Sequence, residues 1–387
     1  MELFNYRKIG GYTKKSSVIL DDKLIELTKA ADYDFNGESS FEVPSFEVPS
    51  DFTLGVIYGS SGTGKSTLLQ EFGEVQEISW DHTKAVASQI DSSLLMRLGL
   101  SSIPSLCRPY HILSTGEKHR ADIAASLKDG CVIDEFTSVC NRALAKSISI
   151  GLRSTIDKLK YKNIVIVTCH EDVIDWLEPD WTINTITRRL VEGRLKRQKS
   201  IYRVVPCNTK AWRLFKDHHY LSGDLNEASY CWLMLDENNM PCGFSSALPF
   251  PGLGRESAWR EHRTVLHPDY QGIGIGSKLS EIVGQFFVNN GYRYFSKTAH
   301  PKLGFHRNHS KLWRATSSNM RDRQDYLKAH DNVKVGHLKK NSIMSVDSLL
   351  IHANRVCYSH EYIGERSEII ASLNKSIKTE SCQLTLF

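Results

Sequence analysis

The sequence lacks the features that mark disulfide-stabilised, zinc-binding and membrane-spanning proteins. Its nine cysteines are scattered, odd in number and never spaced as C-x-x-C, which argues against a disulfide framework and against a zinc knuckle. No window approaches the roughly 20 apolar residues of a membrane span, and the first residues hold no apolar stretch of signal-peptide length. We therefore expect a cytoplasmic protein with free thiols and no membrane partner.

The composition, with 41% hydrophobic and 24% charged residues, is that of an ordinary folded protein. A length of 387 residues predicts two or three domains at roughly 100–200 residues each. Residues 1–187 hold 19 basic and 26 acidic side chains, a net charge of −7, whereas residues 188–387 hold 30 and 18, a net charge of +12. This split predicts two domains with different partners, joined by a basic linker over 188–200.

The sequence pattern of the first half predicts an α/β domain. Short apolar runs alternate with helical patterns, which favours a mostly parallel sheet with helices on its faces. A strand over 5–13, a helix over 21–31 and a turn-rich loop with the tandem repeat FEVPS–FEVPS are expected before it. The expected strands are FTLGVIY (52–58), KAVASQI (84–90), GCVIDEF (130–136) and NIVIVTC (163–169).

A phosphate-binding motif follows the first of these strands. The segment from Gly59 to Thr67 fits G-x-x-x-x-G-K-[ST] without a mismatch and opens a helix, which is the context that the motif requires. Its glycines let successive backbone N–H groups face phosphates, Lys65 reaches the β- and γ-phosphates, and the Ser66 hydroxyl ligates Mg²⁺. The predicted ATP-binding residues of this loop are Gly59, Ser60, Gly62, Gly64, Lys65, Ser66 and Thr67.

Two carboxylates end the strand CVI. Asp134 and Glu135 stand where a metal ligand and a water-activating base are needed beside a phosphate loop. We predict Asp134 as a ligand of Mg²⁺ and Glu135 as the catalytic base; an ordinary acidic pair on the surface is the alternative.

The order of further elements resembles that of ABC-type ATPases over about residues 1–187. Leu113-Ser114-Thr115-Gly116-Glu117 is similar to the family's signature motif, Gln89 stands where its metal-contacting glutamine lies, and His170 where its switch histidine lies. The resemblance implies that Ser114 and Gly116 contact ATP held by a partner chain, so that ATP joins a homodimer. It also implies that Gln89 and His170 contact the nucleotide and its metal.

The second half predicts a smaller α+β domain over 201–330. The expected elements are a helix over 209–220, a hairpin of 230–236 and 243–248, a strand before Pro268, a glycine-rich turn, a helix over 277–289 and a strand over 292–298. Residues 331–387 are a C-terminal extension to which the pattern assigns nothing.

The glycine-rich turn reads HPDYQGIGIG from His267 to Gly276. A dinucleotide site and a structural turn are alternatives, but no acidic residue ends a strand about 20 positions on, as a dinucleotide site requires. The loop resembles the Q/R-x-x-G-x-G/A loop of GCN5-related N-acetyltransferases (GNATs), in which backbone N–H groups hold the pyrophosphate of acetyl-CoA. The residues implied for acetyl-CoA are Val265, Gln271, Gly272, Gly274, Gly276 and Ser277.

The general base of this half is not fixed by the motif. Glu261 and His262 lie on the strand entering the loop, and we choose Glu261 as the catalytic candidate; either could be a surface residue of the strand. Ser296, Thr298 and His300 on the following strand are weaker candidates.

Between Lys302 and Lys340 the chain holds ten basic and three acidic residues, interleaved with aromatic rings. Such a segment suits a phosphate backbone and exposed bases, although a solvated face is an alternative. This half is similar to GNAT-like DNA-modifying acyltransferases of the Mom type. We therefore expect an ATP-switched acyltransferase acting on DNA or tRNA. The alternatives are a GNAT that acetylates a protein lysine or small amine, and a nucleic-acid-binding ATPase whose GNAT-like domain is inactive.

Overall fold

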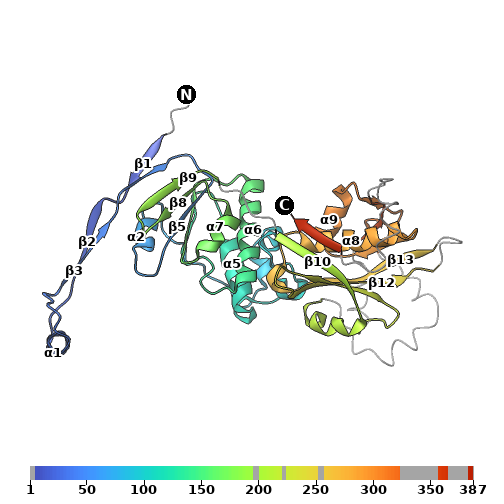
Figure 1. Ribbon diagram of the computed structural model, residues 1–387, viewed down its shortest axis with the longest axis horizontal. Coiled ribbons are helices and arrows are strands. Elements are labelled where there is room, and N and C mark those ends of the chain that lie inside the picture. Colours follow the sequence, from blue (N-terminus) through green and yellow to red (C-terminus); the bar gives the residue numbers. More distant parts are fainter. Residues whose placement is uncertain are drawn as a thin grey trace. The chain divides into compact units, whose positions relative to one another are not determined.

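The computed structural model describes residues 5–194, 200–219, 224–251, 257–322, 356–364 and 382–386. The chain divides into two compact units: unit 1 comprises Met1–Leu98 and Cys107–Gln198, and unit 2 comprises Gly99–Leu106 and Lys199–Phe387. Each unit has its own sheet and its own core (Figure 1). Within the described residues, no helix is long and apolar enough to cross a membrane.

Unit 1 is built on a five-stranded sheet in the order β6-β7-β5-β8-β9. The first four strands are parallel and the last is antiparallel, which confirms the predicted parallel sheet. Every residue of β7 and four of the five of β5 are buried, because strands covered on both faces are apolar throughout. The strands are β5 (Leu54–Tyr58), β6 (Val132–Ile133), β7 (Ile164–Thr168), β8 (Trp181–Asn184) and β9 (Arg189–Glu192).

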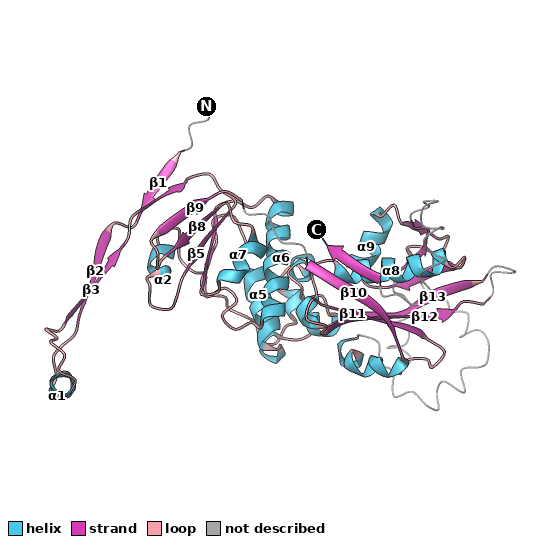
Figure 2. Cartoon of the chain, in the orientation of Figure 1, coloured by secondary structure: helices cyan, strands magenta, loops and turns pink. Residues whose placement is uncertain are grey.

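Two helices of unit 1 begin at residues whose side chains cap them. Asn141 accepts a hydrogen bond from the Leu144 N–H (2.9 Å) at the start of α6 (Arg142–Leu159), and Ser114 caps α5 (Thr115–Ser126). Figure 2 shows these helices beside the strands of the sheet. Unit 1 also contains the helices α2 (Lys65–Leu69), α3 (Ser92–Arg97) and α7 (Ile174–Leu177), and the 3₁₀ turns η1 (Val86–Ser88), η2 (Tyr110–Ile112) and η3 (Glu171–Val173). Helix α4 (Ile103–Leu106) belongs to unit 2.

The first 50 residues differ from the expectation. The strand predicted over 5–13 is two strands, β1 (Tyr6–Ile9) and β2 (Tyr12–Ser17), because Gly10 and Gly11 turn the chain with φ of +69° and +80°. The FEVPS repeat forms β3 (Glu38–Val43) and β4 (Phe46–Pro49) rather than a loop, since Phe-Glu-Val alternates with the period of a strand.

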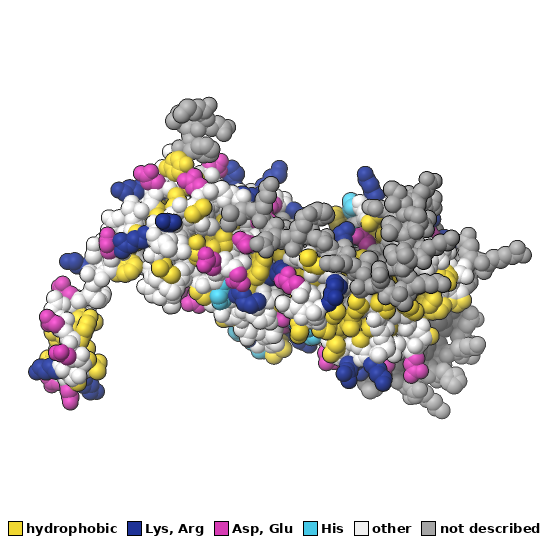
Figure 3. Space-filling model, viewed as in Figure 1, with side chains coloured by type: hydrophobic (Ala, Val, Ile, Leu, Met, Phe, Trp, Pro, Cys, Tyr) yellow, Lys and Arg dark blue, Asp and Glu magenta, His cyan; other side chains and the backbone are white. Residues whose placement is uncertain are grey.

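These strands form an arm, here defined as residues 12–43. β2 pairs with β3 antiparallel, and α1 (Asp22–Ala30) lies between them in the chain, as predicted (Figure 1). Every residue of β2 is exposed, α1 buries none, and the arm carries charged side chains of both signs beside apolar ones (Figure 3). At its base β1 pairs with β4, and Ile9, Val43 and Phe46 join the core of unit 1.

Two further predictions for unit 1 are wrong. The segment 84–90 is not a strand: it contains η1, because the Gln89 side chain binds the backbone of Asp81 and Lys84 and closes a turn. The expected linker 188–200 is not a linker throughout, since β9 completes the sheet.

Unit 2 contains a nine-stranded sheet in the order β15-β17-β14-β13-β12-β11-β10-β18, with β16 paired to β17. β13 and β14 are parallel and the other pairs are antiparallel. The strands are β10 (Ser200–Cys207), β11 (Tyr230–Leu235), β12 (Pro241–Pro249), β13 (Ala258–Leu266), β14 (Arg293–Thr298), β15 (Trp313–Ala315), β16 (Arg321–Asp322), β17 (Val356–Tyr362) and β18 (Cys382–Leu386).

The predicted hairpin, glycine-loop helix and following strand are confirmed as β11–β12, α8 (Ile275–Asn289) and β14. The helix expected over 209–220 is instead two 3₁₀ segments, η4 (Thr209–Leu214) and η5 (Lys216–His218), and residues 220–223 lie outside the description. Trp212 and Phe215, three residues apart, both enter a core cluster with Phe244, a spacing that suits three residues per turn. The 3₁₀ turn η6 (Pro268–Tyr270) precedes α8. Helix α9 (Pro301–His309) follows β14 in the chain.

The parallel pair β13–β14 is registered over only three positions, from Ala258↔Arg293 to Arg260↔Phe295. Beyond these positions β13 continues for six residues to Leu266 while pairing only with β12. The two strands therefore diverge, and the backbone edge of β13 that faces β14 has no ladder partner there.

The segment 331–387, which the sequence left unassigned, supplies two strands where it is described. β17 pairs with β14, and β18 pairs with β10. Tyr362 of β17 packs against Gly284 of α8, where an added Cβ would lie 2.8 Å from its ring.

Gly284→Ala should therefore destabilise unit 2 by about 1–3 kcal/mol, because the methyl group overpacks this contact. Denaturant unfolding followed by tryptophan fluorescence measures the change. Combined with Tyr362→Ala, the same substitution should cost much less, since the ring that it strikes is gone. An equal cost in both backgrounds would show that β17 does not pack on α8.

Candidate functional site

The predicted phosphate loop lies between β5 and α2. Gly59, Gly62 and Gly64 have φ of +150°, +80° and +84°, a region that L side chains rarely adopt, so the loop depends on glycine. Gly64 precedes α2, and no side chain caps the N-terminus of that helix. The Lys65 ammonium group donates a hydrogen bond to the Ser60 carbonyl at 2.6 Å, which folds its side chain back over the loop.

This loop lines a cavity of about 530 Å³, here called the P-loop cavity. Asp134 and Glu135 line it too, so the structure brings the predicted metal ligand and base to the loop. Sequence reasoning missed Lys14 and Phe41, which come from the arm; the Phe41 ring packs so closely on Gly64 that a Cβ there would lie 2.5 Å away. The lining residues from the loop are Ser61, Gly62, Gly64, Lys65, Ser66 and Thr67.

The acidic pair sits on a strained turn. The Asp134 carboxylate accepts a hydrogen bond from the Glu135 N–H (2.8 Å), and both Glu135 and Thr137 have left-handed φ, +50° and +66°. Such a conformation costs roughly 1–3 kcal/mol at a residue other than glycine and is typical of functional sites. His170 is tied to this turn, since its Nδ1 lies 3.2 Å from the Thr137 hydroxyl.

Besides Gly59 and Ser60 of the loop itself, four predicted residues lie outside the lining of the P-loop cavity: Gln89, Ser114, Gly116 and His170. The Gln89 amide is engaged by the backbone of Asp81 and Lys84. Ser114 and Glu117 form a capping box at the start of α5, and Gly116 packs so closely on Leu144 that a Cβ would lie 2.5 Å away. The nucleotide-binding roles of all four stay predictions.

The glycine-rich loop of unit 2 repeats the geometry of the first. Gly272 and Gly274 have φ of +92° and +86°, and Gly274 precedes α8 with no side chain capping the helix. No heavy atom lies within 4 Å of a Cβ built at Gly274, so the helix N-terminus faces open space. Uncapped N–H groups and the helix dipole make such a terminus suited to an anion.

The loop opens into a cavity of about 240 Å³ between the diverging strands, here called the β13–β14 cavity. All six residues predicted for acetyl-CoA line it: Val265, Gln271, Gly272, Gly274, Gly276 and Ser277. Gln271 is held in place by its own hydrogen bonds, donating to the Leu266 carbonyl at 3.2 Å and accepting from the Ser101 hydroxyl at 2.8 Å. The other polar residues of the lining are Ser102, His218, His219, Glu261, His262, Thr264, Lys297, Thr298, His300 and Lys302, besides Ser101.

Glu261 reaches the cavity but its carboxylate is engaged. It accepts hydrogen bonds from Thr264 (2.6 Å), from Ser296 and from Arg307 (2.8 Å). Burial alone would raise the pKa of Glu261, but the Arg307 charge and the hydrogen bonds outweigh it and lower the pKa. Because these hydrogen bonds and the ion pair occupy its oxygens, the geometry suits Glu261 to an ion pair better than to proton transfer, and its catalytic role stays a prediction.

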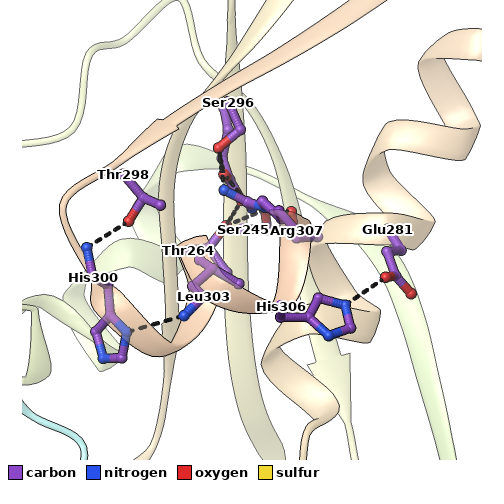
Figure 4. Close-up of polar contacts among 11 residues, drawn as sticks. Ser245, Thr264, Glu281, Ser296, Thr298, His300, Leu303, His306 and Arg307 are labelled. Atoms are coloured by element: carbon purple, nitrogen blue, oxygen red, sulfur yellow. Dashed lines mark hydrogen bonds and ion pairs between the residues drawn. The ribbon is translucent and has the colours of Figure 1, made fainter. Parts of the chain in front are cut away.

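Arg307 is the centre of this cluster (Figure 4). Its guanidinium donates to Glu261, to the hydroxyl of Ser296 and to that of Ser280 (2.7 Å), and lies 4.3 Å from the centre of the Trp313 ring. Figure 4 also shows that His300 turns away from the cluster: its Nδ1 accepts from the Leu303 N–H at 3.4 Å, and its Nε2 lies 3.1 Å from the Ser101 carbonyl.

Comparison with known families identifies unit 2. Residues 194–309 match the model of the acetyltransferase (GNAT) family. They contain the glycine-rich loop, α8 and the diverging strands, and this part of the chain is a GNAT domain. No curated protein matches the sequence.

Solved structures similar to the chain fall into two groups. A bacterial ABC transporter cassette in dimeric form is 13% identical, covering 48% of this chain and 98% of its own, with a TM-score of 0.35. A spermidine N-acetyltransferase chimera from Vibrio cholerae is 10% identical, covering 42% and 94%, with a TM-score of 0.28. The NatC complex bound to Gag peptide and CoA is 11% identical, covering 42% and 97%, with the same score of 0.28. The ABC ATPase-like fold of unit 1 rests on its parallel sheet and on the order of its motifs along that sheet.

Removing the Arg307 charge should show how much the stability of unit 2 depends on the ion pair with Glu261. Arg307→Met should cost about 3–5 kcal/mol, because it leaves a buried carboxylate without its partner. Adding Glu261→Gln should recover much of that loss. Chemical denaturation at neutral pH measures both variants, and a single variant as stable as wild type would contradict this account.

The Arg307–Glu261 ion pair also predicts that unit 2 loses stability at acidic pH. Because the pKa of Glu261 is lowered from 4.5 in the folded state, its stabilisation is complete above about pH 4.5 and is lost as the pH falls through the lowered value. The double variant should lose less stability than wild type between neutral pH and pH 3.

Proposed function

We propose that the chain couples an ATP-binding domain of ABC type to an acetyl-CoA-dependent N-acyltransferase whose acceptor is a base of nucleic acid, in DNA or tRNA. The observation that carries the choice of acceptor is the charge of the β13–β14 cavity. Lys297 and Lys302 line it, and the carboxylate of Glu261 is neutralised by Arg307.

The P-loop cavity suits ATP with a divalent cation. Backbone N–H groups of such a loop suit phosphates, and Lys65, whose ammonium group is bonded to the Ser60 carbonyl, lines the same cavity. The Ser66 hydroxyl and the Asp134 carboxylate, both of which line the cavity, supply oxygen ligands of the kind that Mg²⁺ prefers. Glu135, exposed on the strained turn and lining the same cavity, would orient the attacking water.

The β13–β14 cavity suits acetyl-CoA. The N-terminus of α8 and the loop from Gln271 to Gly276 offer uncapped N–H groups to a pyrophosphate. The unpaired edge of β13 offers backbone groups to an extended arm that carries amides, as a missing strand would. Bound there, acetyl-CoA supplies an activated thioester carbonyl.

The surroundings of the cavity favour an uncharged acceptor attached to phosphates over a cationic amine. A cationic acceptor is best held by carboxylates, and the one in the described lining is already paired with an arginine. On α9, which begins beside the cavity, the Phe305 ring is 64% exposed and suited to stacking on a base. The net charge of +12 in residues 188–387 agrees with a phosphate-bearing partner, although much of the basic segment 302–340 lies outside the described residues.

Labelled acetyl-CoA decides between the acceptors. Incubation of the chain with DNA, tRNA, protein and polyamine pools, with and without ATP, should label nucleic acid. Gly274→Glu, which places a carboxylate at the pyrophosphate position, should abolish labelling at least about 100-fold while leaving ATP binding intact. Label in protein or polyamine alone would favour the alternative acceptors, and acetyl-CoA binding without any transfer would favour an inactive GNAT domain.

ATP-dependent dimerisation is the second part of the proposal. Ser114 and Gly116 stand outside the P-loop cavity of their own chain, in keeping with a role toward ATP on a partner. Glu135→Gln should slow hydrolysis and trap a dimer in ATP and Mg²⁺, measured by light scattering after size-exclusion chromatography. Combining it with Lys65→Ala, which removes the phosphate contact, should abolish the dimer. A Glu135→Gln chain that stays monomeric with bound ATP refutes the dimer.

A further inference from the structure

His262 occupies an irregular position in the sheet. Ser246 of β12 pairs with Arg263, and the next residue, Ala247, pairs with Glu261, so His262 is the extra residue of a β-bulge. A bulge bends its strand and turns the side chain of the extra residue away from the regular alternation. His262 is the second residue after the last registered pair of β13 with β14, where the two strands diverge.

The imidazole of His262 lines the β13–β14 cavity together with the glycine-rich loop. Its Nε2 is buried and has no hydrogen-bond partner among the described residues. A buried polar atom without a partner costs about 1–3 kcal/mol, and such atoms are rare in folded proteins. Because the His262 side chain lines the cavity, a partner that arrives with the substrate would satisfy this buried nitrogen.

We infer that His262 is the general base of acyl transfer in this cavity. Its Nε2 accepts the proton that the acceptor nitrogen loses as that nitrogen bonds to the acetyl carbon. His262 then returns this proton to the CoA sulfur, which leaves with the electron pair of the broken carbon–sulfur bond. The products are an amide and a thiol, and the imidazole is regenerated. The inference rests on the acyltransferase part of the proposed function and not on the identity of the acceptor.

Other candidates in the described lining are already engaged. The Glu261 carboxylate is bonded to Thr264, Ser296 and Arg307. Both ring nitrogens of His300 have backbone partners, in Leu303 and Ser101. The hydrogen-bonding capacity of these two groups is used within the fold, whereas Nε2 of His262 keeps its own for the acceptor.

The charges around His262 keep its ring neutral. Burial lowers the pKa of His262 to about 4, and the neighbouring Arg263, Arg260 and His219 lower it in the same direction. Glu261, the adjacent carboxylate, is neutralised by Arg307 and offers little compensation. The ring is therefore uncharged at neutral pH, and its lone pair is free to accept a proton.

The rate at which the CoA thiol is released tests the inference. With acetyl-CoA and the nucleic-acid, protein and polyamine pools, or with water as the minimal acceptor, His262→Gln should release thiol about 100-fold more slowly than wild type at neutral pH. Its dissociation constant for acetyl-CoA, from calorimetry, should change less than about twofold. His309→Gln, an exposed histidine of α9 outside the cavity lining, is the matched control and should match wild type.

Chemical rescue separates a base from a structural residue. Added imidazole should restore part of the activity of His262→Ala, because the free base can enter the vacated space; it should not affect the Gly274→Glu chain. A His262→Gln chain as fast as wild type, or slowed only as far as acetyl-CoA binding is weakened, overturns the inference and leaves the proposed function standing. A wild-type chain that releases no thiol with any pool overturns both.

Discussion

The ion pair between Arg307 and Glu261 fixes the geometry on which unit 2 depends. Arg307 comes from α9 and reaches β13 through Glu261, β14 through Ser296, α8 through Ser280 and β15 through the ring of Trp313. Glu261 and Ser296 are the residues directly after the last registered pair of their strands. Side-chain contacts thus join β13 and β14 where their backbone pairing ends, and the two strands diverge from that position. Because separating two buried charges is costly, the Arg307–Glu261 ion pair holds the width of the cavity fixed.

The two units use the same local device for two different ligands. In each, a strand is followed by glycines with positive φ, and a helix without a side-chain cap begins directly after them. The loops differ in what faces them: Asp134 and Glu135 in unit 1, and histidines and lysines in unit 2. The shared device explains anion binding, and the facing residues decide which chemistry follows it.

The two glycine-rich loops could be predicted because each is short and continuous. The loop from Gly59 to Thr67 and the one from Gln271 to Ser277 carry their conformations in their own glycines. Contacts between distant segments could not be predicted in this way: Arg307 lies 46 residues from Glu261, and Phe41 reaches the P-loop from the arm. The strand predicted at 84–90 failed because one side chain, Gln89, supplied hydrogen bonds that favour a turn. The bulge at His262 depends on register, which a single strand does not encode.

The strands β17 and β18 lie beyond the region that matches the acetyltransferase family, yet they cover the two flanks of its sheet. β14 would otherwise present an open backbone edge on one side and β10 on the other. Open edges are templates for pairing with other chains, so a fragment cut at the end of the family match would be prone to aggregate. For anyone dissecting this protein, the boundary for soluble expression therefore differs from the boundary of recognisable sequence.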